Sequence, residues 1–563
     1  MLHRFARLGI VTASAVVSAC NPAPDERPAS AADSGAAISG AARSIDAVGL
    51  RSVIEELASD RYEGRGPATE GDLLTQRYLS DALDRMGMLP AGDNDSWLQP
   101  FDIVSVTTMA PSTWVFERGA DSLALAHWDD YIAVSGTQAD RAEIEDAELV
   151  FVGYGIQAPE YDWDDFKGTD VRGKVLLMLN NDPDWDPALF EGNRRLYYGR
   201  WTYKYEMAAA LGAAGAIIIH TTPSAGYPFQ VVQTSWSGAQ YQLPAGSEAT
   251  TDIQAWVSEQ AAAELVALSG RDLETLVSAA RSPTFEPIAL GISTSLQLEN
   301  SLSRVETANV AGLLEGSDAA LREEVVVYTA HHDHLGRIES EDDSDGIYNG
   351  ARDNAAGVAQ VLEIADAFAA LEVAPRRSIL FLFVAAEEQG LLGSAFYARQ
   401  PSIPPGQIAA NVNLDGGNIW GRTQDVTFIG YGKSSLDAIV EQAADAQGRR
   451  VQGDQFPDRG YFYRSDQFNF AKIGVPAVYL DEGTDFVDRP EGWGVEQIEQ
   501  WVSVHYHQPS DELEENWNFE GMIEDTQLAY AIGLEIANAD TLPAWNPGDE
   551  FEAARIEALR ALQ

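Results

Sequence analysis

Residues 325–334 read Val-Val-Val-Tyr-Thr-Ala-His-His-Asp-His, so a continuous apolar run leads directly into four side chains that can bind metals. A helix-like stretch follows at 355–371, and a second continuous apolar run follows at 379–385. Buried strands that alternate with amphipathic helices are typical of a mostly parallel sheet with helices on both faces. We therefore predict an α/β fold over residues 296–545, with ligands bound beyond the carboxyl ends of its strands.

Side chains of the metal-binding types lie at several of these strand ends. In the first, the two-residue period of a strand places His331 and Asp333 on one face and His332 on the other. This His-x-Asp spacing allows a carboxylate to orient a neighbouring imidazole, as happens at metal sites. The other candidates are Asp353 before a helix, Glu387 and Glu388 after an apolar run, Asp415 before two glycines, and His507 on a loop. Each of these residues has an ordinary structural explanation when it is considered alone. By itself, Asp353 would be interpreted as a helix N-cap.

Taken together, these residues resemble a known enzyme family. The motifs are Gly-Ala-x-Asp-Asn-x-x-Gly at 350–357, Glu-Glu-x-Gly-Leu-x-Gly-Ser at 387–394 and Asn-x-Asp-Gly at 413–416. With His331-x-Asp333 before them and His507 after them, they resemble the bacterial di-zinc aminopeptidase family, whose relatives include aminopeptidase Y and glutamate carboxypeptidase. The resemblance extends from about residue 300 to about residue 540.

The resemblance implies a site with two Zn²⁺ ions. His331 and Asp415 would bind one ion, Glu388 and His507 would bind the other, and Asp353 would bridge them. Glu387 would be the general base and Asp333 would orient His331, with Asp511 as a similar partner for His507. One imidazole and two carboxylates per ion suit catalytic zinc better than calcium or magnesium. The expected function is therefore a zinc-dependent exopeptidase, an aminopeptidase that cleaves peptides with a water bridging the metals.

Upstream of this region the sequence changes to short β-like runs. The segments 149–155, 173–174 and 208–219 resemble the protease-associated domain that is often inserted in such enzymes. We expect a β-rich protease-associated domain at 131–295. The remaining predicted parts are N-terminal helices of the peptidase domain at 43–130 and a C-terminal helical tail at 546–563.

The N-terminus has the features of an export signal. A short basic start precedes an apolar run at 8–17, and Val17-Ser18-Ala19-Cys20 resembles a bacterial lipobox in which the cysteine becomes lipidated. Cys20 is the only cysteine, so a metal in the folded part must use His, Asp or Glu. We expect a signal peptide at 1–20, a flexible tether at 21–42, and an exported lipoprotein of the cell envelope that meets the membrane only through its lipid anchor.

The charge balance argues against one class of partner. Lys and Arg number 37 and Asp and Glu number 87, which gives a net charge of −50. Such a field repels phosphate backbones, so nucleic acid is not an expected partner. The sequence leaves the oligomeric state open.

Several residues compete for the assigned roles. His332 and His334 are alternatives to His331, and His505 is an alternative to His507. Glu341, Asp343 and Asp345 resemble the first half of a calcium loop, but Arg352 stands where its closing Glu should be.

Substrate contacts and the direction of cleavage remain open from sequence. The resemblance places Ser465 and Asp466, with Tyr463 beside them, near the substrate, although a role at the edge of the core is equally open. A carboxypeptidase of the same family, with Arg352 or Arg464 holding the substrate carboxylate, is the alternative enzyme. A non-catalytic binding protein on the same fold is the alternative from another class. A glutaminyl cyclase is disfavoured by the inserted domain.

Overall fold

The computed structural model describes residues 40, 42–187, 189–225, 227–246, 249–338 and 345–563. Cys20 and the rest of the predicted signal peptide lie outside the described residues, as do Glu341 and Asp343 of the calcium-loop alternative. Along the described part of the chain, no helix combines the length and the apolar character needed to cross a bilayer.

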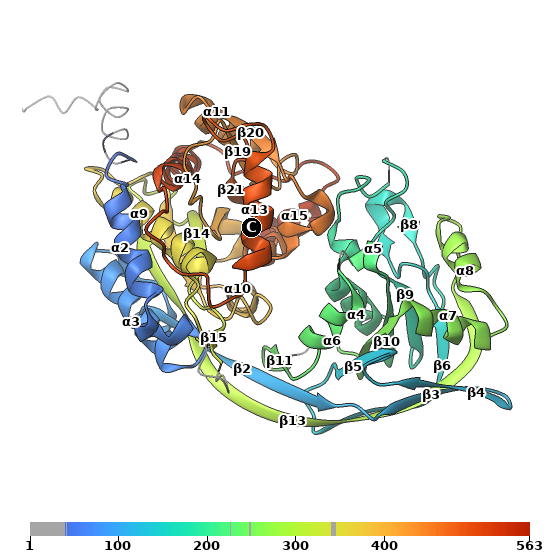
Figure 1. Cartoon of the computed structure of the whole chain (residues 1–563). Helices are drawn as coiled ribbons and strands as arrows, with labels where there is room; N and C mark the ends of the chain where they lie inside the picture. The colour runs from blue at the N-terminus through green and yellow to red at the C-terminus, as the bar shows by residue number, and fades with distance from the viewer. Residues whose placement is uncertain (1–39, 41, 188, 226, 247–248, 339–344) are drawn as a thin grey trace, which may run out of the picture.

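Two lobes share a pair of long strands that run along the base of the molecule (Figure 1). These strands, β2 (Leu98–Met109) and β13 (Ile288–Leu314), pair antiparallel along the whole of β2. At its two ends, β13 pairs with β17 (Ser378–Val384) in the large lobe and with β6 (Arg141–Phe151) in the small lobe. One strand therefore belongs to both sheets, and the predicted domain boundary between residues 295 and 296 falls inside it.

The large lobe contains the predicted mostly parallel sheet. Its central strands β17, β14, β18 and β21 are parallel neighbours in that order. Shorter strands extend it, antiparallel β19 beside β21 and then β20 beside β19. The bounds are β1 (Leu89–Pro90), β14 (Val325–His331), β18 (Ile408–Leu414), β19 (Asp425–Ile429), β20 (Arg450–Gly453) and β21 (Ala477–Glu482), and small hairpin strands lie at β15 (Gly336–Arg337) and β16 (Ile347–Tyr348). Every residue of β14, β17 and β18 is buried, as expected for strands covered on both faces.

Helices cover both faces of this sheet, so alternate residues of each strand enter different cores. Phe381 and Phe383 pack in the core formed with α2, α3, α9, α11 and α14. Leu380 and Leu382 face the opposite core, with Tyr397 of α10 and Phe470 of α12. The helices are α2 (Ala47–Leu57), α3 (Glu70–Arg85), α9 (Gly357–Ala369), α10 (Leu392–Arg399), α11 (Leu436–Ala446), α12 (Gln467–Lys472), α13 (Trp493–Val504), α14 (Glu520–Asn538) and α15 (Glu552–Arg560).

The small lobe has its own sheet with a parallel centre, in which β6, β9, β10 and β12 are parallel neighbours. Antiparallel β5 flanks β12, the hairpin of β3 and β4 pairs with β13, and β11 pairs with β2. The strands are β3 (Thr113–Arg118), β4 (Asp121–Ala126), β5 (Tyr131–Ser135), β7 (Gln157–Ala158), β8 (Trp163–Asp164), β9 (Val175–Leu179), β10 (Gly215–His220), β11 (Ala239–Gln242) and β12 (Ile253–Ser258). The helices are α4 (Trp201–Ala210), α5 (Thr222–Ala225), α6 (Phe229–Ser235), α7 (Glu259–Leu268) and α8 (Leu273–Ala280).

The packing moves one predicted boundary. Trp114, Phe116 and Leu125 are buried in the core of the small lobe, together with strands β9 and β10. The hairpin at 113–126 therefore packs with the small lobe, although residues 43–130 were expected to belong with the N-terminal helices. The reason is the ladder to β13, which carries the hairpin away from those helices.

Candidate metal centre

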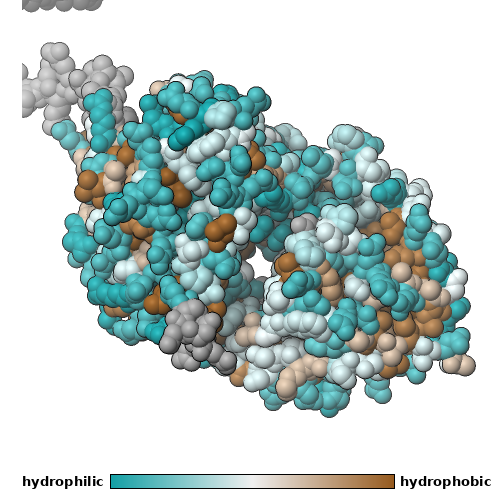
Figure 2. All heavy atoms as spheres, viewed as in Figure 1, coloured by the Kyte–Doolittle hydropathy of each residue, from teal (hydrophilic) through white to brown (hydrophobic). Residues whose placement is uncertain are grey.

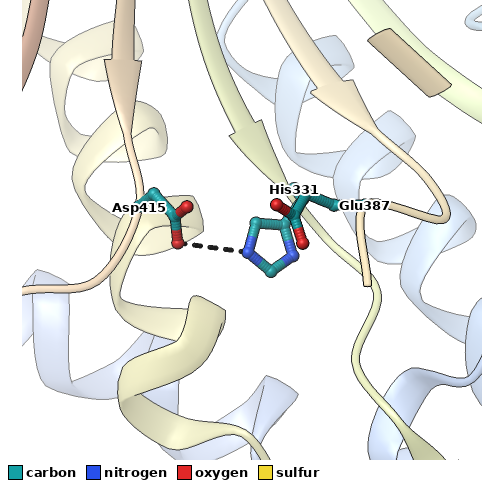
Figure 3. A group of neighbouring side chains, drawn as sticks. All are labelled: His331, Glu387 and Asp415. Carbon is teal, nitrogen blue, oxygen red and sulfur yellow. Dashed lines mark hydrogen bonds and ion pairs between the residues drawn. The ribbon is translucent and has the colours of Figure 1, made fainter. Parts of the chain in front are cut away.

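The predicted ligands converge because parallel strands present their carboxyl ends at one edge of the sheet. His331 is the last residue of β14, Asp415 follows the end of β18, and Glu387 lies just beyond the end of β17. Figure 3 shows these three side chains facing one another across the strand ends. Asp353 and His507 reach the same place from the turn before α9 and the loop after α13.

The distances divide this cluster into two halves joined by one carboxylate. His331 Nε2 lies 3.2 Å from Asp415 Oδ1 and 3.2 Å from Asp353 Oδ1. His507 Nε2 lies 3.3 Å from Asp353 Oδ2 and 3.0 Å from Glu388 Oε2. Asp353 thus turns one carboxylate oxygen toward each histidine. This is the arrangement that a bridging ligand requires, and it assembles all five predicted ligands.

The positions of these nitrogen and oxygen atoms suit ligands of shared metal ions better than hydrogen bonds between the side chains. His507 Nε2 is buried and makes no well-aligned hydrogen bond to a described residue, although two carboxylate oxygens lie within 3.3 Å of it. Ligand atoms of His331, Glu387 and Asp415, and also those of His331, Asp353 and Glu388, lie within 4.8 Å of one another. A set of imidazole nitrogens and carboxylate oxygens at this spacing suits zinc.

Electrostatics among these side chains favours protonated histidines and ionised forms of Glu388 and Asp353. Burial would lower the pKa of His331 and His507, but the surrounding carboxylates prevail, raising the pKa of His331 well above its usual value and that of His507 to about 10. Burial and Asp353 would raise the pKa of Glu388, but His334 and His507 prevail and lower it to about 2. Burial would raise the pKa of Asp353, but the close contacts with His331 and His507 prevail and hold it well below its usual value. The two protonated histidines balance the negative charge of the carboxylates, which bound metal ions would otherwise do.

Glu387 differs from the other carboxylates. Loss of solvent raises its pKa well above the usual value, and the negative charges of Asp415 and Glu388 add to this effect, although His331 opposes it. A carboxylate with a raised pKa that faces the ligand cluster has the properties of a general base.

Asp333 supports the site in a different way from the one predicted. Its carboxylate lies 3.8 Å from His331 Nδ1, whereas its backbone carbonyl lies 3.2 Å from that nitrogen. The carboxylate instead accepts hydrogen bonds from the backbone N–H groups of Glu387 at 3.0 Å and Glu388 at 3.4 Å. Asp333 therefore fixes the two glutamates as well as the histidine.

Asp511 also has a partner that the sequence did not indicate. It accepts hydrogen bonds from the backbone N–H groups of Arg352 and Asp353, both at 3.0 Å. It thus orients the bridging carboxylate, whereas we expected it to orient His507.

The competing histidines separate clearly. His332 points away from the cluster, as strand alternation predicts, and its Nε2 lies 3.2 Å from Asp72. His505 Nδ1 lies 2.9 Å from the carbonyl of Ser510. His334 was considered as an alternative ligand to His331, but its Nδ1 lies 2.5 Å from Glu388 Oε1 and so supports that ligand.

Arg65 is a supporting residue that sequence reasoning missed altogether. Its buried guanidinium donates hydrogen bonds to the carbonyls of His332 at 3.0 Å, Asn349 at 2.6 Å and Gly350 at 2.8 Å. A fourth hydrogen bond reaches the carbonyl of Leu57 at 2.7 Å. No sequence signal could have found it, because Arg65 lies far from the other motifs along the chain.

The metal cluster opens into a cleft of about 910 Å³ between the two lobes. An opening between the lobes is visible in Figure 2, amid a largely hydrophilic surface. Ser465 lines the cleft, and its hydroxyl accepts a hydrogen bond from Asn413. Tyr463 instead donates to Glu550 at 2.6 Å within a separate hydrophobic core. Asp466 is fully buried, and burial raises its pKa to about 7.

Arg352 lines the cleft but is already neutralised. Its guanidinium lies 2.6 Å from Glu482 and stacks 4.3 Å from the ring centre of Trp501 and 5.0 Å from that of Trp420. Of the two arginines considered for a carboxylate clamp, only Arg464 therefore remains without an ion pair to a described residue.

Sequence comparison finds a family match for the part of the chain that contains these candidate ligands. Residues 309–531 match the peptidase family M28. This segment belongs to peptidase family M28. It contains all five candidate ligands and Glu387, and it confirms the family predicted from the motifs.

Individual relatives agree with this assignment at the level of fold. The M28 segment and the small lobe together resemble an aminopeptidase from Aneurinibacillus sp. strain AM-1, with 19% identity, a TM-score of 0.50, and coverage of 90% of this chain and 97% of that one. A probable zinc metalloprotease of Pyricularia oryzae is 37% identical over 112 residues. That match spans 20% of this chain and 20% of the fungal protein.

Proposed function

We propose that this protein is a zinc-dependent exopeptidase and, more specifically, an aminopeptidase. The observation that carries the proposal is Asp353, whose two oxygens face His331 and His507 at 3.2 and 3.3 Å. The M28 segment supports a peptidase. The names of the two relatives, an aminopeptidase and a probable zinc metalloprotease, agree with this function.

The residues would divide the chemistry as follows. His331 and Asp415 would hold one zinc ion, Glu388 and His507 the other, and Asp353 both. When bound, such a pair would lower the pKa of a water molecule and polarise the carbonyl of the peptide bond. Glu387 would take the proton of the attacking water and pass it to the leaving amine, for which its raised pKa suits it. Asp333 would keep Glu387 and Glu388 in register through their backbone N–H groups.

The charges of the cleft favour an aminopeptidase over the alternative. Asp481 lines the cleft, and burial together with neighbouring Glu482 raises its pKa well above the usual value. A positive ammonium group beside it would relieve that cost, so Asp481 is a suitable acceptor for the substrate N-terminus. Arg352 is already neutralised by Glu482 at 2.6 Å, which makes it a weaker carboxylate clamp.

The test combines metal analysis with substrate chemistry. Purified protein should contain close to two zinc ions and lose activity to a chelator. It should cleave leucine p-nitroanilide, but not the same compound with an acetylated amino group. One tightly bound metal, or full activity without metal, would overturn the dinuclear site. Faster cleavage of N-blocked peptides with free carboxyl ends would favour the carboxypeptidase, and no hydrolysis of any peptide would favour the binding protein.

We further propose that Cys20 is lipidated and anchors the protein at the cell envelope. The support is the lipobox-like sequence and the absence of any other cysteine. Cys20→Ser should move the protein from the membrane fraction to the soluble fraction without changing its specific activity, because the M28 segment begins far downstream at residue 309. Wild-type protein found wholly in the medium would overturn the anchor.

A further inference from the structure

Three arginines line the cleft without forming an ion pair to any described residue. They are Arg195 and Arg200 of the small lobe and Arg464 of the large lobe. Other arginines lining the same cleft are neutralised: Arg352 pairs with Glu482 at 2.6 Å, and Arg459 pairs with Glu499 at 3.2 Å. The chain has 87 acidic residues against 37 basic ones, so three unpaired arginines at one place need an explanation.

The contacts of these arginines leave much of their hydrogen-bonding capacity unused. One terminal nitrogen of Arg195 donates to the carbonyl of Ser224 at 2.8 Å, but its Nε is buried without a partner among the described residues. The same holds for the buried Nε of Arg200. Arg464 is exposed to the cleft and lies over the ring of Tyr461, 5.2 Å from its centre. Unsatisfied buried donors are costly, which favours a role in binding an acceptor that arrives from outside.

The three guanidinium groups lie close enough to affect one another. Burial lowers the pKa of Arg200 to about 9, and the positive charges of Arg464 and Arg195 act in the same direction. Tyr227 lines the same cleft, and burial raises the pKa of its hydroxyl while all three arginines act to lower it. Asp182 and Asp458 attract Arg195 from beyond ion-pair distance, and a carboxylate oxygen of Asp182 is already engaged by the N–H of Leu196. A purely structural cluster would have brought carboxylates into contact with these charges.

The cluster also lies near the catalytic carboxylate. The negative charge of Glu387 is among those that raise the pKa of Arg464. Arg464 immediately precedes Ser465, whose hydroxyl contacts Asn413, two residues before the ligand Asp415. Arg464 and Glu387 line the same cleft, so an anion held by Arg464 would share that cleft with the bond that the metal centre would cleave.

We propose that Arg195, Arg200 and Arg464 form a subsite for a carboxylate of the peptide substrate. This inference rests on the proposed peptidase function and narrows its substrate class. Planar guanidinium groups form paired hydrogen bonds with carboxylates, and groups from both lobes can surround one anion. The carboxylate would be the free C-terminus of a short peptide or an acidic side chain near the cleaved bond.

Hydrolysis of matched peptides tests the subsite and separates these two sources. Leu-Gly-Gly is compared with its C-terminal amide, and Leu-Asp-amide is compared with Leu-Asn-amide, using the zinc-loaded protein. We expect kcat/KM to be at least about tenfold higher for the carboxylate member of one pair, and the pair that responds identifies the source. Cleavage of all four peptides at similar rates would overturn the subsite while leaving the peptidase intact.

Substitutions of the arginines test whether they cause the preference for the carboxylate peptide. Arg200→Gln and Arg464→Gln should each reduce the acid-to-neutral ratio of kcat/KM toward one, and Arg464→Lys should restore part of it. Arg459→Gln is the matched control, because this arginine lines the same cleft but already pairs with Glu499. A ratio that survives both glutamine variants would overturn the proposal, as would a ratio lost equally in the Arg459 control.

A binding measurement keeps the test independent of catalysis. N-acetyl-glycylglycine and its amide carry no free amino group, so their binding to zinc-loaded protein can be followed by calorimetry without N-terminal cleavage. We expect the acid to bind at least about tenfold more tightly than the amide, and Arg464→Gln to remove the difference. If no peptide is cleaved but this difference appears, the peptidase proposal fails and the anion subsite stands. Equal binding of acid and amide, together with equal rates for Leu-Asp-amide and Leu-Asn-amide, overturns the subsite.

Discussion

Replacing Glu387 with Gln tests the division of roles between two adjacent glutamates. Glutamine keeps the size and shape of the side chain but cannot accept a proton. General-base catalysis typically contributes about 10²–10⁴-fold, which corresponds to about 2.7–5.4 kcal/mol of transition-state stabilisation. We therefore expect kcat of Glu387→Gln to fall by about 10²–10⁴-fold.

The same structure predicts that zinc stays in place. The five candidate ligands are other residues, and Asp333 holds positions 387 and 388 by their backbone N–H groups, which the substitution does not change. Glu388→Gln is the matched comparison. Glu388 lies 3.0 Å from His507 and 2.5 Å from His334, so a neutral amide there removes an anionic ligand and should lower zinc content together with kcat.

The assay is zinc stoichiometry measured beside kcat for both variants, with thermal unfolding as a check that each remains folded. Loss of zinc from Glu387→Gln with retention in Glu388→Gln would show that the two roles are reversed. The result would be informative, since Glu387 itself lies among atoms close enough to hold a metal with His331 and Asp415.

Three further predictions concern the bridge, the protons and the support of the site. Asp353→Asn should reduce zinc content at both positions, below that of Glu388→Gln, because one carboxylate faces both histidines; retention of one full equivalent would contradict this. Zinc binding near pH 7.5 should release about two protons and weaken as the pH falls, because the pKa values of His331 and His507 are raised before zinc binds and zinc needs both imidazoles neutral. Calorimetry in buffers of different ionisation enthalpy measures the proton release, and identical binding heats in all buffers would refute it. Arg65→Met should lower the free energy of unfolding in urea by about 3–5 kcal/mol, because several buried carbonyls lose a charged donor; a loss under about 1 kcal/mol would show that this support is dispensable.

The sequence predicted best where a single physical rule decides the outcome. Fully buried strands are continuous apolar runs, so β14 and β17 were located to within two residues of their observed ends. Strand alternation separated His331 from His332, which contacts Asp72 instead. The long strand β13 was missed because its residues 301–306 are exposed and mostly polar, a pattern that resembles a loop more than a buried strand.

Contacts between remote segments were beyond the reach of sequence patterns. Arg65 and Gly350 are 285 residues apart, and nothing in the sequence around either residue indicates the other. Asp511 was assigned to the nearby ligand His507, because proximity along the chain was the only guide. The fold places its carboxylate against the N–H groups of residues 352 and 353 instead.

The cleft is the part of the site that depends most on how the two lobes meet. Between the lobes, residues 301–306 of β13 are exposed, so this stretch of β13 pairs with β2 through the backbone but adds little hydrophobic packing of its own. A further connection is a contact around Tyr197 of the small lobe, whose ring lies 4.9 Å from that of Phe468 in α12, beside an ion pair of 3.2 Å between Lys472 and Glu206. In the sequence, Tyr197 lies between Arg195 and Arg200, and Phe468 follows shortly after Arg464 and Ser465. The same interface that positions the small lobe therefore also brings together, in one cleft, arginines that are about 265 residues apart in the sequence.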